Sequence, residues 1–202
     1  MSPRTTQANQ HIRDQRKDQI LKAALKIFAR QGYASTKITD IAARAGVSYG
    51  LIDHYFGKKE DIYIAVIEQA FAGALALLES GLQQPGSPWD RLHYICARIL
   101  AGVQDEPEYV LLVNQVSSNA AIPEETKKLF YGYEKRSMDL QVELVRQGQA
   151  AGLVVAGDPQ ELVMAFSAII QGLAIQSFDR MMHEDMQNHF PGVDTVLRIL
   201  KA

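Results

Sequence analysis

The stretch that decides the fold is residues 36–61, which read TKITDIAARAGVSYGLIDHYFGKKED. Thr39 and Ser48 are residues of the type that caps helix N-termini, because their side-chain oxygens accept hydrogen bonds from the first backbone N–H groups. Gly46 and Gly57 suit helix C-termini, where the chain adopts the left-handed conformation that glycine tolerates. The stretch therefore predicts two short helices, each enclosed by a cap residue and a glycine and joined by a tight turn.

Two short helices with this connection form a helix-turn-helix. We expect the inward apolar set to be Ile41, Ala45, Val47, Ile52 and Phe56. The residues left on the outer face are Ser48, Tyr49, Gly50, Leu51, Asp53, His54 and Tyr55. In such a unit the second helix enters the DNA major groove, with its N-terminal residues nearest the base edges. The outer face is small, aromatic and hydrogen-bonding, which suits contacts to bases and phosphates.

Helical patterns also dominate the rest of the 202 residues. Apolar residues recur at helical spacing over residues 20–28, and an apolar-rich segment runs over residues 58–83. Residues 84–88 are the clearest break, and Ser87-Pro88-Trp89-Asp90 reads as the start of the next helix. Leu153-Val154-Val155 is too short an apolar run to seed a sheet. The sequence predicts an all-α fold of about nine helices.

Charge divides the chain into a basic head and an acidic body. Residues 1–62 hold 11 Lys and Arg against 6 Asp and Glu, whereas residues 63–202 hold 10 against 17. A basic head suits a polyanionic partner. The single cysteine, Cys96, excludes an internal disulfide and is interpreted as a small buried apolar residue. No signal peptide and no run of about 20 apolar residues is evident, so we expect a cytoplasmic protein without a membrane span.

Residues 15–65 resemble the TetR family of bacterial transcriptional repressors. The positions that match the family pattern are Thr39-Asp40-Ile41-Ala42, Ala45-Gly46-Val47-Ser48, Gly50, Ile52, Tyr55-Phe56 and Lys59-Glu60, preceded by Ala23-Ala24-Leu25, Phe28, Gly32-Tyr33 and Thr36. The resemblance implies an N-terminal arm and helix-turn-helix DNA-binding domain over residues 1–62. It also implies a helical ligand-binding and dimerisation domain over residues 63–202. The implied function is a homodimeric repressor that binds a near-palindromic double-stranded DNA operator and is released by a small-molecule effector.

The resemblance assigns DNA contacts residue by residue. The DNA-binding set is Thr39, Ser48, Tyr49, Gly50, Leu51, His54, Tyr55 and Lys59. His54, Tyr55 and Lys59 are expected to contact phosphates, and Thr39 and Ser48 to cap helices while bonding a phosphate. Tyr49, Gly50 and Leu51 are expected to face the bases. Asp53 departs from the family pattern. It accepts a hydrogen bond from cytosine N4, or else pairs with a basic side chain of the protein.

The body is expected to hold the effector and to form the dimer. The candidate effector residues are Phe71, Tyr94, Tyr109, Asn114, Phe130, Tyr133, Met138 and Gln171, a set that favours a mainly apolar or aromatic ligand. The candidate dimer residues are Leu162, Phe166, Ile169, Ile170, Leu173 and Phe178, with Ile175, in a helix over residues 158–182 that would pair together with residues 193–201. The alternative for the first of these segments is a central core helix of one protomer.

A second hypothesis is an all-helical small-molecule binding protein or an enzyme whose head is only structural. The body shows no phosphate-binding loop, nucleophile elbow or other catalytic motif, so no enzymatic activity and no cofactor are expected. His183-Glu184-Asp185 with His189 lacks the spacing of a helical zinc site, so no metal is expected either. The basic head and its exposed aromatic face favour the DNA-binding regulator.

Overall fold

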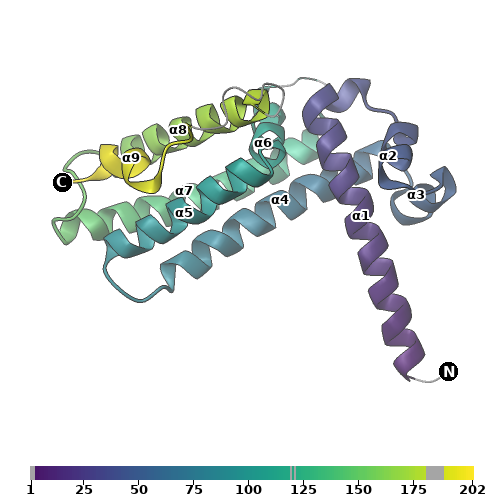
Figure 1. Ribbon diagram of the computed structural model, residues 1–202, viewed down its shortest axis with the longest axis horizontal. Coiled ribbons are helices and arrows are strands. Elements are labelled where there is room, and N and C mark those ends of the chain that lie inside the picture. The colour runs from purple at the N-terminus through teal and green to yellow at the C-terminus, as the bar shows by residue number, and fades with distance from the viewer. Residues whose placement is uncertain (1–2, 119, 121, 181–188) are drawn as a thin grey trace.

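The computed structural model describes residues 3–118, 120, 122–180 and 189–202. The helices in this part of the chain are α1 (Pro3–Ser35), α2 (Ile38–Ala45), α3 (Tyr49–Phe56), α4 (Lys59–Leu82), α5 (Pro88–Asp105), α6 (Glu108–Ser118), α7 (Glu124–Ala150), α8 (Pro159–Arg180) and α9 (Val193–Leu197), with the 3-10 turn η2 (Arg198–Leu200). The described residues contain no strand beyond one isolated bridge between Val154 and Lys201. The predicted all-α fold is confirmed (Figure 1).

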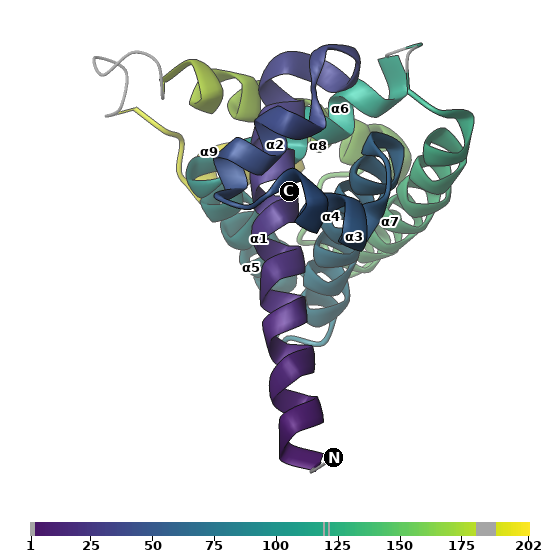
Figure 2. The same ribbon diagram turned by 90° about the vertical axis from the view of Figure 1, so that its right-hand side faces the viewer.

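Helix α1 is far longer than its apolar pattern indicates. Ile20, Ala24 and Phe28 are fully buried, whereas residues 8–17 are all exposed. The N-terminal half of α1 projects away from the other helices (Figure 2). The sequence predicted no helix there, because periodicity reports a buried face and this half of α1 has none. Gly32 has φ 75°, which kinks the helix, and helical turns resume as far as Ser35.

The caps of α2 and α3 follow the sequence with one exception. Gly46 is left-handed at φ 64° and donates to the carbonyls of Ala42 and Ala43, and the Ser48 hydroxyl accepts from the Leu51 amide at 3.3 Å. The prediction that Thr39 caps α2 is wrong. The N-cap is Lys37, whose carbonyl already accepts the first helical hydrogen bonds, so Thr39 is the second residue inside α2.

One hydrophobic core joins the head to the body. Its buried residues come from α1 to α4, from α6 and from the start of α7, and include Ile20, Phe28, Ile41, Ile52, Phe56, Tyr63, Ile67, Phe71, Leu112, Val116 and Phe130. The boundary proposed at residues 62 and 63 falls inside α4, and packing is continuous across it. The helix-turn-helix is therefore fixed directly to helices of the body.

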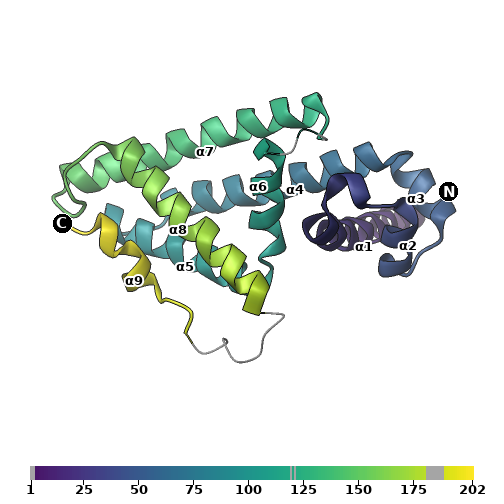
Figure 3. The ribbon, with the colours of Figure 1, turned by 90° about the horizontal axis from the view of Figure 1, so that it is seen from above.

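The body is built on three lengthwise helices, α4, α5 and α7, with α6 crossing them near the head (Figure 3). A second core, formed by α5, α7, α8, α9 and η2, includes Cys96, Val145, Phe166, Leu173 and Leu197. Helix α8 lies over this core at the surface of the body (Figures 1 and 3). The C-terminus is tied to the α7–α8 connection, where the Val155 amide donates to the Leu200 carbonyl at 2.9 Å.

By length and composition alone, α4 is apolar enough to cross a membrane. A core helix of a soluble protein has the same length and composition. Ile62, Tyr63, Val66 and Ile67 of α4 are each at most 1% exposed within the first core. Packing against α1 and the body therefore accounts for the apolar residues in the first turns of this helix, whereas Ala72, Gly73, Ala74 and Ala76 are exposed.

A close approach of α4 and α5 generates a stability prediction. A Cβ atom added at Gly81 would overlap the Ile95 side chain, whereas one added at Gly73 of the same helix meets nothing within 4 Å. Gly81→Ala should lower the free energy of unfolding by about 1–3 kcal/mol through overpacking. Gly73→Ala should raise it by about 0.5–1 kcal/mol, because alanine loses less backbone entropy in a helix. Equal effects in denaturant titrations at one protein concentration would contradict this packing.

Candidate nucleic-acid interface

Helix α3 presents one face to solvent and buries the other. Ile52 is fully buried and Phe56 is 9% exposed, so these two side chains anchor α3 in the first core. The predicted inward set is confirmed, with Ile41 and Ala45 buried and Val47 packed against the same core. Ser48, Tyr49, Gly50, Asp53 and His54 are exposed, and Leu51 and Tyr55 are half-buried. A rigidly held helix thus offers its first turn to a partner.

The residues predicted to face bases lie together on this first turn. Tyr49 is 53% exposed, Gly50 has open space above its Cα, and Leu51 follows directly. Asp53 is exposed and forms no ion pair with any residue that the structure describes. Of the two roles considered for Asp53, pairing within the protein thus has no support here, and contact with cytosine N4 stays a prediction.

The residues predicted to contact phosphates are spread over α2 and both ends of α3, unlike those predicted to face bases. Thr39 is exposed on α2, and Ser48 already uses its hydroxyl to cap α3. The rings of His54 and Tyr55 lie 5.4 Å apart, and Tyr55 also packs against the first core. Thr39, Ser48 and His54 are exposed, whereas Tyr55 is half-buried. Phosphate contact stays a prediction for these four residues.

Lys59 is engaged within the protein. Its Nζ donates to the carbonyl oxygens of Tyr33 at 2.8 Å, Ala34 at 3.3 Å and Thr36 at 3.0 Å. No pattern in the sequence indicates this contact, because every residue carries a backbone carbonyl oxygen whatever its side chain. The role of Lys59 toward phosphate stays a prediction, and its observed partners are backbone atoms at the end of α1.

Two more contacts fix the helix-turn-helix to α1. The Gln19 Nε2 donates to the Ala45 carbonyl at 2.7 Å, at the C-terminus of α2. The Lys17 Nζ lies 5.7 Å from the centre of the Phe56 ring, at the C-terminus of α3. The C-termini of α2 and α3 are therefore both held by side chains of α1, and neither contact uses the exposed residues of α3.

The pattern of the family described as "Bacterial regulatory proteins, tetR family" matches residues 20–66. The match spans the second half of α1, the two helices of the helix-turn-helix and the first turns of α4. The head of this chain is a TetR-family helix-turn-helix. The resemblance that the sequence carried is confirmed.

Relatives extend the TetR likeness to most of the chain. The chain is 29% identical over 164 residues to the HTH-type transcriptional regulator BetI of Rhizobium meliloti (strain 1021), covering 80% of this chain and 77% of that protein. It is 27% identical over 156 residues to the HTH-type transcriptional repressor NicS of Pseudomonas putida, covering 76% and 72%. A transcriptional regulator from Saccharomonospora viridis, solved in complex with choline, shares the fold with a TM-score of 0.68 and 23% identity, covering 92% and 93%. The chain is thus a TetR-type, DNA-binding transcriptional regulator.

In this TetR body, the structure gathers half of the candidate effector residues. Phe71, Tyr109, Phe130 and Tyr133 all belong to the first core or pack against it. The rings of Phe71 and Tyr133 stack at 5.1 Å, and Phe71 meets Phe130 edge-on at 5.6 Å. Burial raises the pKa of Tyr109, with Glu106 adding to the shift. Phe71, Phe130 and Tyr133 form an aromatic cluster between α4 and α7, and Tyr109 of α6 packs against the same core.

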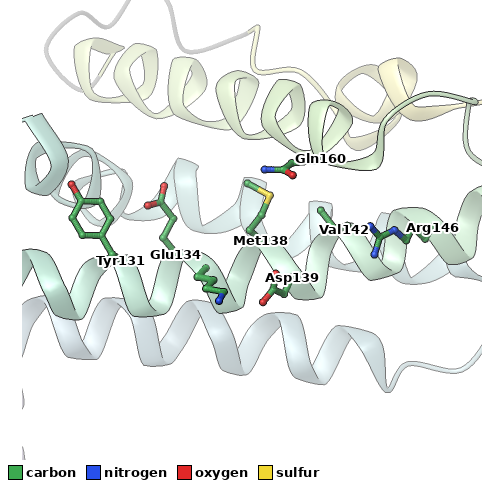
Figure 4. Close-up of a pocket in the computed structure, with 8 residues that line it drawn as sticks. Tyr131, Glu134, Met138, Asp139, Val142, Arg146 and Gln160 are labelled. Atoms are coloured by element: carbon green, nitrogen blue, oxygen red, sulfur yellow. The ribbon is translucent and has the colours of Figure 1, made fainter.

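The other candidates are dispersed. Tyr94 packs against a third, small core of Leu78, Ile95 and Leu144. Gln171 is exposed on the outer face of α8, and Asn114 is half-buried on α6. Met138 lines an open groove of about 580 Å³ between α7 and α8. The remaining lining residues of this groove, which the sequence did not single out, are Tyr131, Glu134, Lys135, Asp139, Val142, Arg146 and Gln160 (Figure 4).

Helix α8 turns most of the candidate dimer residues inward. Phe166, Ile170 and Leu173 are each 8% exposed, and Leu162 and Ile169 pack against the same second core. The candidate Phe178 lies outside the residues whose side chains the structure describes. The outer face of α8 is formed instead by Met164, Ala165, Ala168, Gln171, Gly172 and Ile175. Sequence periodicity could not separate the two faces, because both are apolar.

No group of three or more possible metal ligands occurs among the residues that the structure describes. His183, Glu184 and Asp185 lie outside them. Cys96 is fully buried in the second core, as predicted, and burial raises the pKa of its thiol to about 11.

Tyr49 offers a direct test of base reading on α3. Tyr49→Ala should change which base is preferred at one or two operator positions and cost about 1–3 kcal/mol of affinity for the original site. The free energy of unfolding should stay within about 0.5 kcal/mol, because the side chain is exposed. Tyr131→Ala in α7 is the matched control, since Tyr131 is also 53% exposed. An unchanged base preference in selected DNA would exclude Tyr49 from the readout.

Proposed function

We propose that the protein is a homodimeric repressor that binds a near-palindromic operator and leaves it when a small effector binds the body. The observation that carries this proposal is the first turn of α3. Tyr49 and Gly50 are exposed there and Leu51 is half-buried, while Ile52 and Phe56 fix the same helix in the first core. A recognition helix needs this combination, because rigid placement of a few side chains decides base-specific contact. The relative from Pseudomonas putida is named a repressor, which supports repression rather than activation.

The dimer is proposed to form through the outer face of α8. Met164 and Ile175 are 58% and 51% exposed, and between them lie Ala165, Ala168 and Gly172. Exposed apolar residues separated by small ones let a second helix approach closely and bury the stripe. A twofold axis at this face would place two α3 helices about 34 Å apart and so require a near-palindrome.

The effector is proposed to bind beside the aromatic cluster of Phe71, Phe130 and Tyr133, with Tyr109 packed against the same core. The apolar and aromatic character of this cluster supports a ligand of similar character. A ligand that fits one arrangement of α4 and α6 would shift the population toward it and alter the separation of the two heads. The choline complex of the structural neighbour supports a ligand-binding body in this fold.

We further propose that the protein acts in the cytoplasm and catalyses no reaction.

Selection from a random DNA library at near-physiological salt tests the proposed function. The purified protein should enrich a near-palindrome whose half-sites are one helical turn or a multiple apart. Affinity for the enriched site should fall steeply with salt, because bound phosphates release counterions. A folded, dimeric protein that enriches no sequence would contradict the proposal and favour a purely structural head.

The dimer face generates a second prediction. Ala168→Arg places a charged side chain in the middle of the exposed stripe of α8, so the molar mass in solution should halve and cooperative operator binding should be lost. Ala76→Arg in α4 is the control, because Ala76 is also exposed and α4 lies on the opposite side of the body from α8 (Figure 1). Analytical ultracentrifugation of both variants gives the answer. A dimer that survives Ala168→Arg would place the interface elsewhere.

A further inference from the structure

The first residue of α4 ties together two points that lie far apart in the chain. Lys59 lies three residues after the end of the recognition helix, and its Nζ reaches the carbonyl oxygens of Tyr33, Ala34 and Thr36 at 2.8–3.3 Å. The chain between Thr36 and Lys59 contains all of α2 and α3. The helix-turn-helix is therefore a loop whose two ends are joined by one ammonium group.

The donors of this ammonium are fully used. A lysine Nζ carries three N–H donors and no acceptor, and three carbonyl oxygens accept from it here. The last carbonyls of a helix have no intrahelical partner and carry partial negative charge, so a cation is favoured at that point. The Nζ also lies 4.5 Å from the centre of the Tyr33 ring. A phosphate oxygen could bind Lys59 only by displacing one of these carbonyls.

The surroundings make the joint rigid. Thr36 is 2% exposed, and its hydroxyl donates to the Gly32 carbonyl at 2.8 Å. Tyr33 packs against Tyr63 of α4 at a ring distance of 4.9 Å, and Tyr63 meets Phe28 edge-on at 4.8 Å. Polar and aromatic contacts thus hold the end of α1 on the start of α4. Because α4 continues into the body, this joint sets the angle of α3 to the rest of the protomer.

We propose that Lys59 is a positioning residue that fixes the direction of the recognition helix and thereby the operator spacing that the dimer accepts. It acts through the carbonyls of α1 and not through a phosphate. The inference rests on the proposed function, since operator spacing has meaning only for a dimer that binds two half-sites.

Three variants separate positioning from phosphate binding. Lys59→Met removes the donors and keeps most of the side-chain volume. Lys59→Arg keeps the charge in a planar fork that suits phosphate but does not match the tetrahedral donor directions of an ammonium. Lys58→Met is the matched control, because it removes the same charge one residue earlier, where the Lys58 side chain forms an ion pair with Glu60 at 3.9 Å.

Binding is measured on the selected operator and on versions with one base pair added or removed between the half-sites, across a range of salt. For Lys59→Met the preference for the original spacing should fall about tenfold, as expected when a charge-assisted joint is lost. The slope of log affinity against log salt should stay unchanged, and Lys59→Arg should not restore the preference. Lys58→Met should retain the spacing preference of the original protein.

Two binding results would overturn the proposal. A slope reduced by about 0.9 in Lys59→Met, with spacing preference intact and binding restored by Lys59→Arg, would make Lys59 a phosphate contact. A lower melting temperature with both binding properties unchanged would make it a stabilising residue only.

Amide hydrogen exchange tests the contact of Lys59 with the end of α1 in the absence of DNA. Residues 37–58 should exchange faster in Lys59→Met than in the original protein, because the loop is no longer closed. If the original protein selects no DNA, the proposed function fails, whereas unchanged exchange in residues 37–58 would overturn the role of Lys59 by itself.

Discussion

The rest of the structure depends on the packing of α1 against the first turns of α4. Ile62, Tyr63, Val66 and Ile67 of α4 are almost completely buried in the core that also holds Phe28. This one interface supports the helix-turn-helix on one side and begins the body on the other. The exposed face of α3 is useful only because it is fixed in this way, since a loosely held helix would present no defined set of base contacts.

The same core connects the proposed effector site in the body with the DNA-binding head. Leu112 and Val116 of α6 are fully buried in it beside residues of α1. The Gln115 Nε2 donates to the Ala29 carbonyl at 3.0 Å, and Arg30 lies 3.9 Å from the buried carboxylate of Glu108. Helix α6 therefore contacts α1 at several points, through both apolar and polar side chains. A shift of α6 beside the aromatic cluster would reach the head directly, since close-packed cores move between discrete arrangements.

Local features were predictable because they depend on residues at most four apart. Ser48 caps α3, Gly46 ends α2, and Ser87 and Asp90 form a reciprocal capping box at the start of α5. The wrong prediction at Thr39 is also local, because the N-cap of α2 is Lys37, only two residues before the predicted cap. Four of the eight candidate effector residues lie in or against the first core, and the other four are spread over the body. The sequence could not separate these two groups, because the type of a residue does not indicate which helices will pack together.

The sequence by itself determined the helix-turn-helix, its inward residues and the family, because these follow from cap residues and apolar spacing within one continuous stretch. Only the tertiary structure decided which face of α8 packs inside the protomer, since Phe166 and Met164 are equally apolar and lie on opposite sides of that helix. It also decided the partners of Lys59, which are carbonyl oxygens 23–26 residues away. Backbone carbonyls occur at every position, so only the folding of α1 onto α4 marks out the three that bind this side chain.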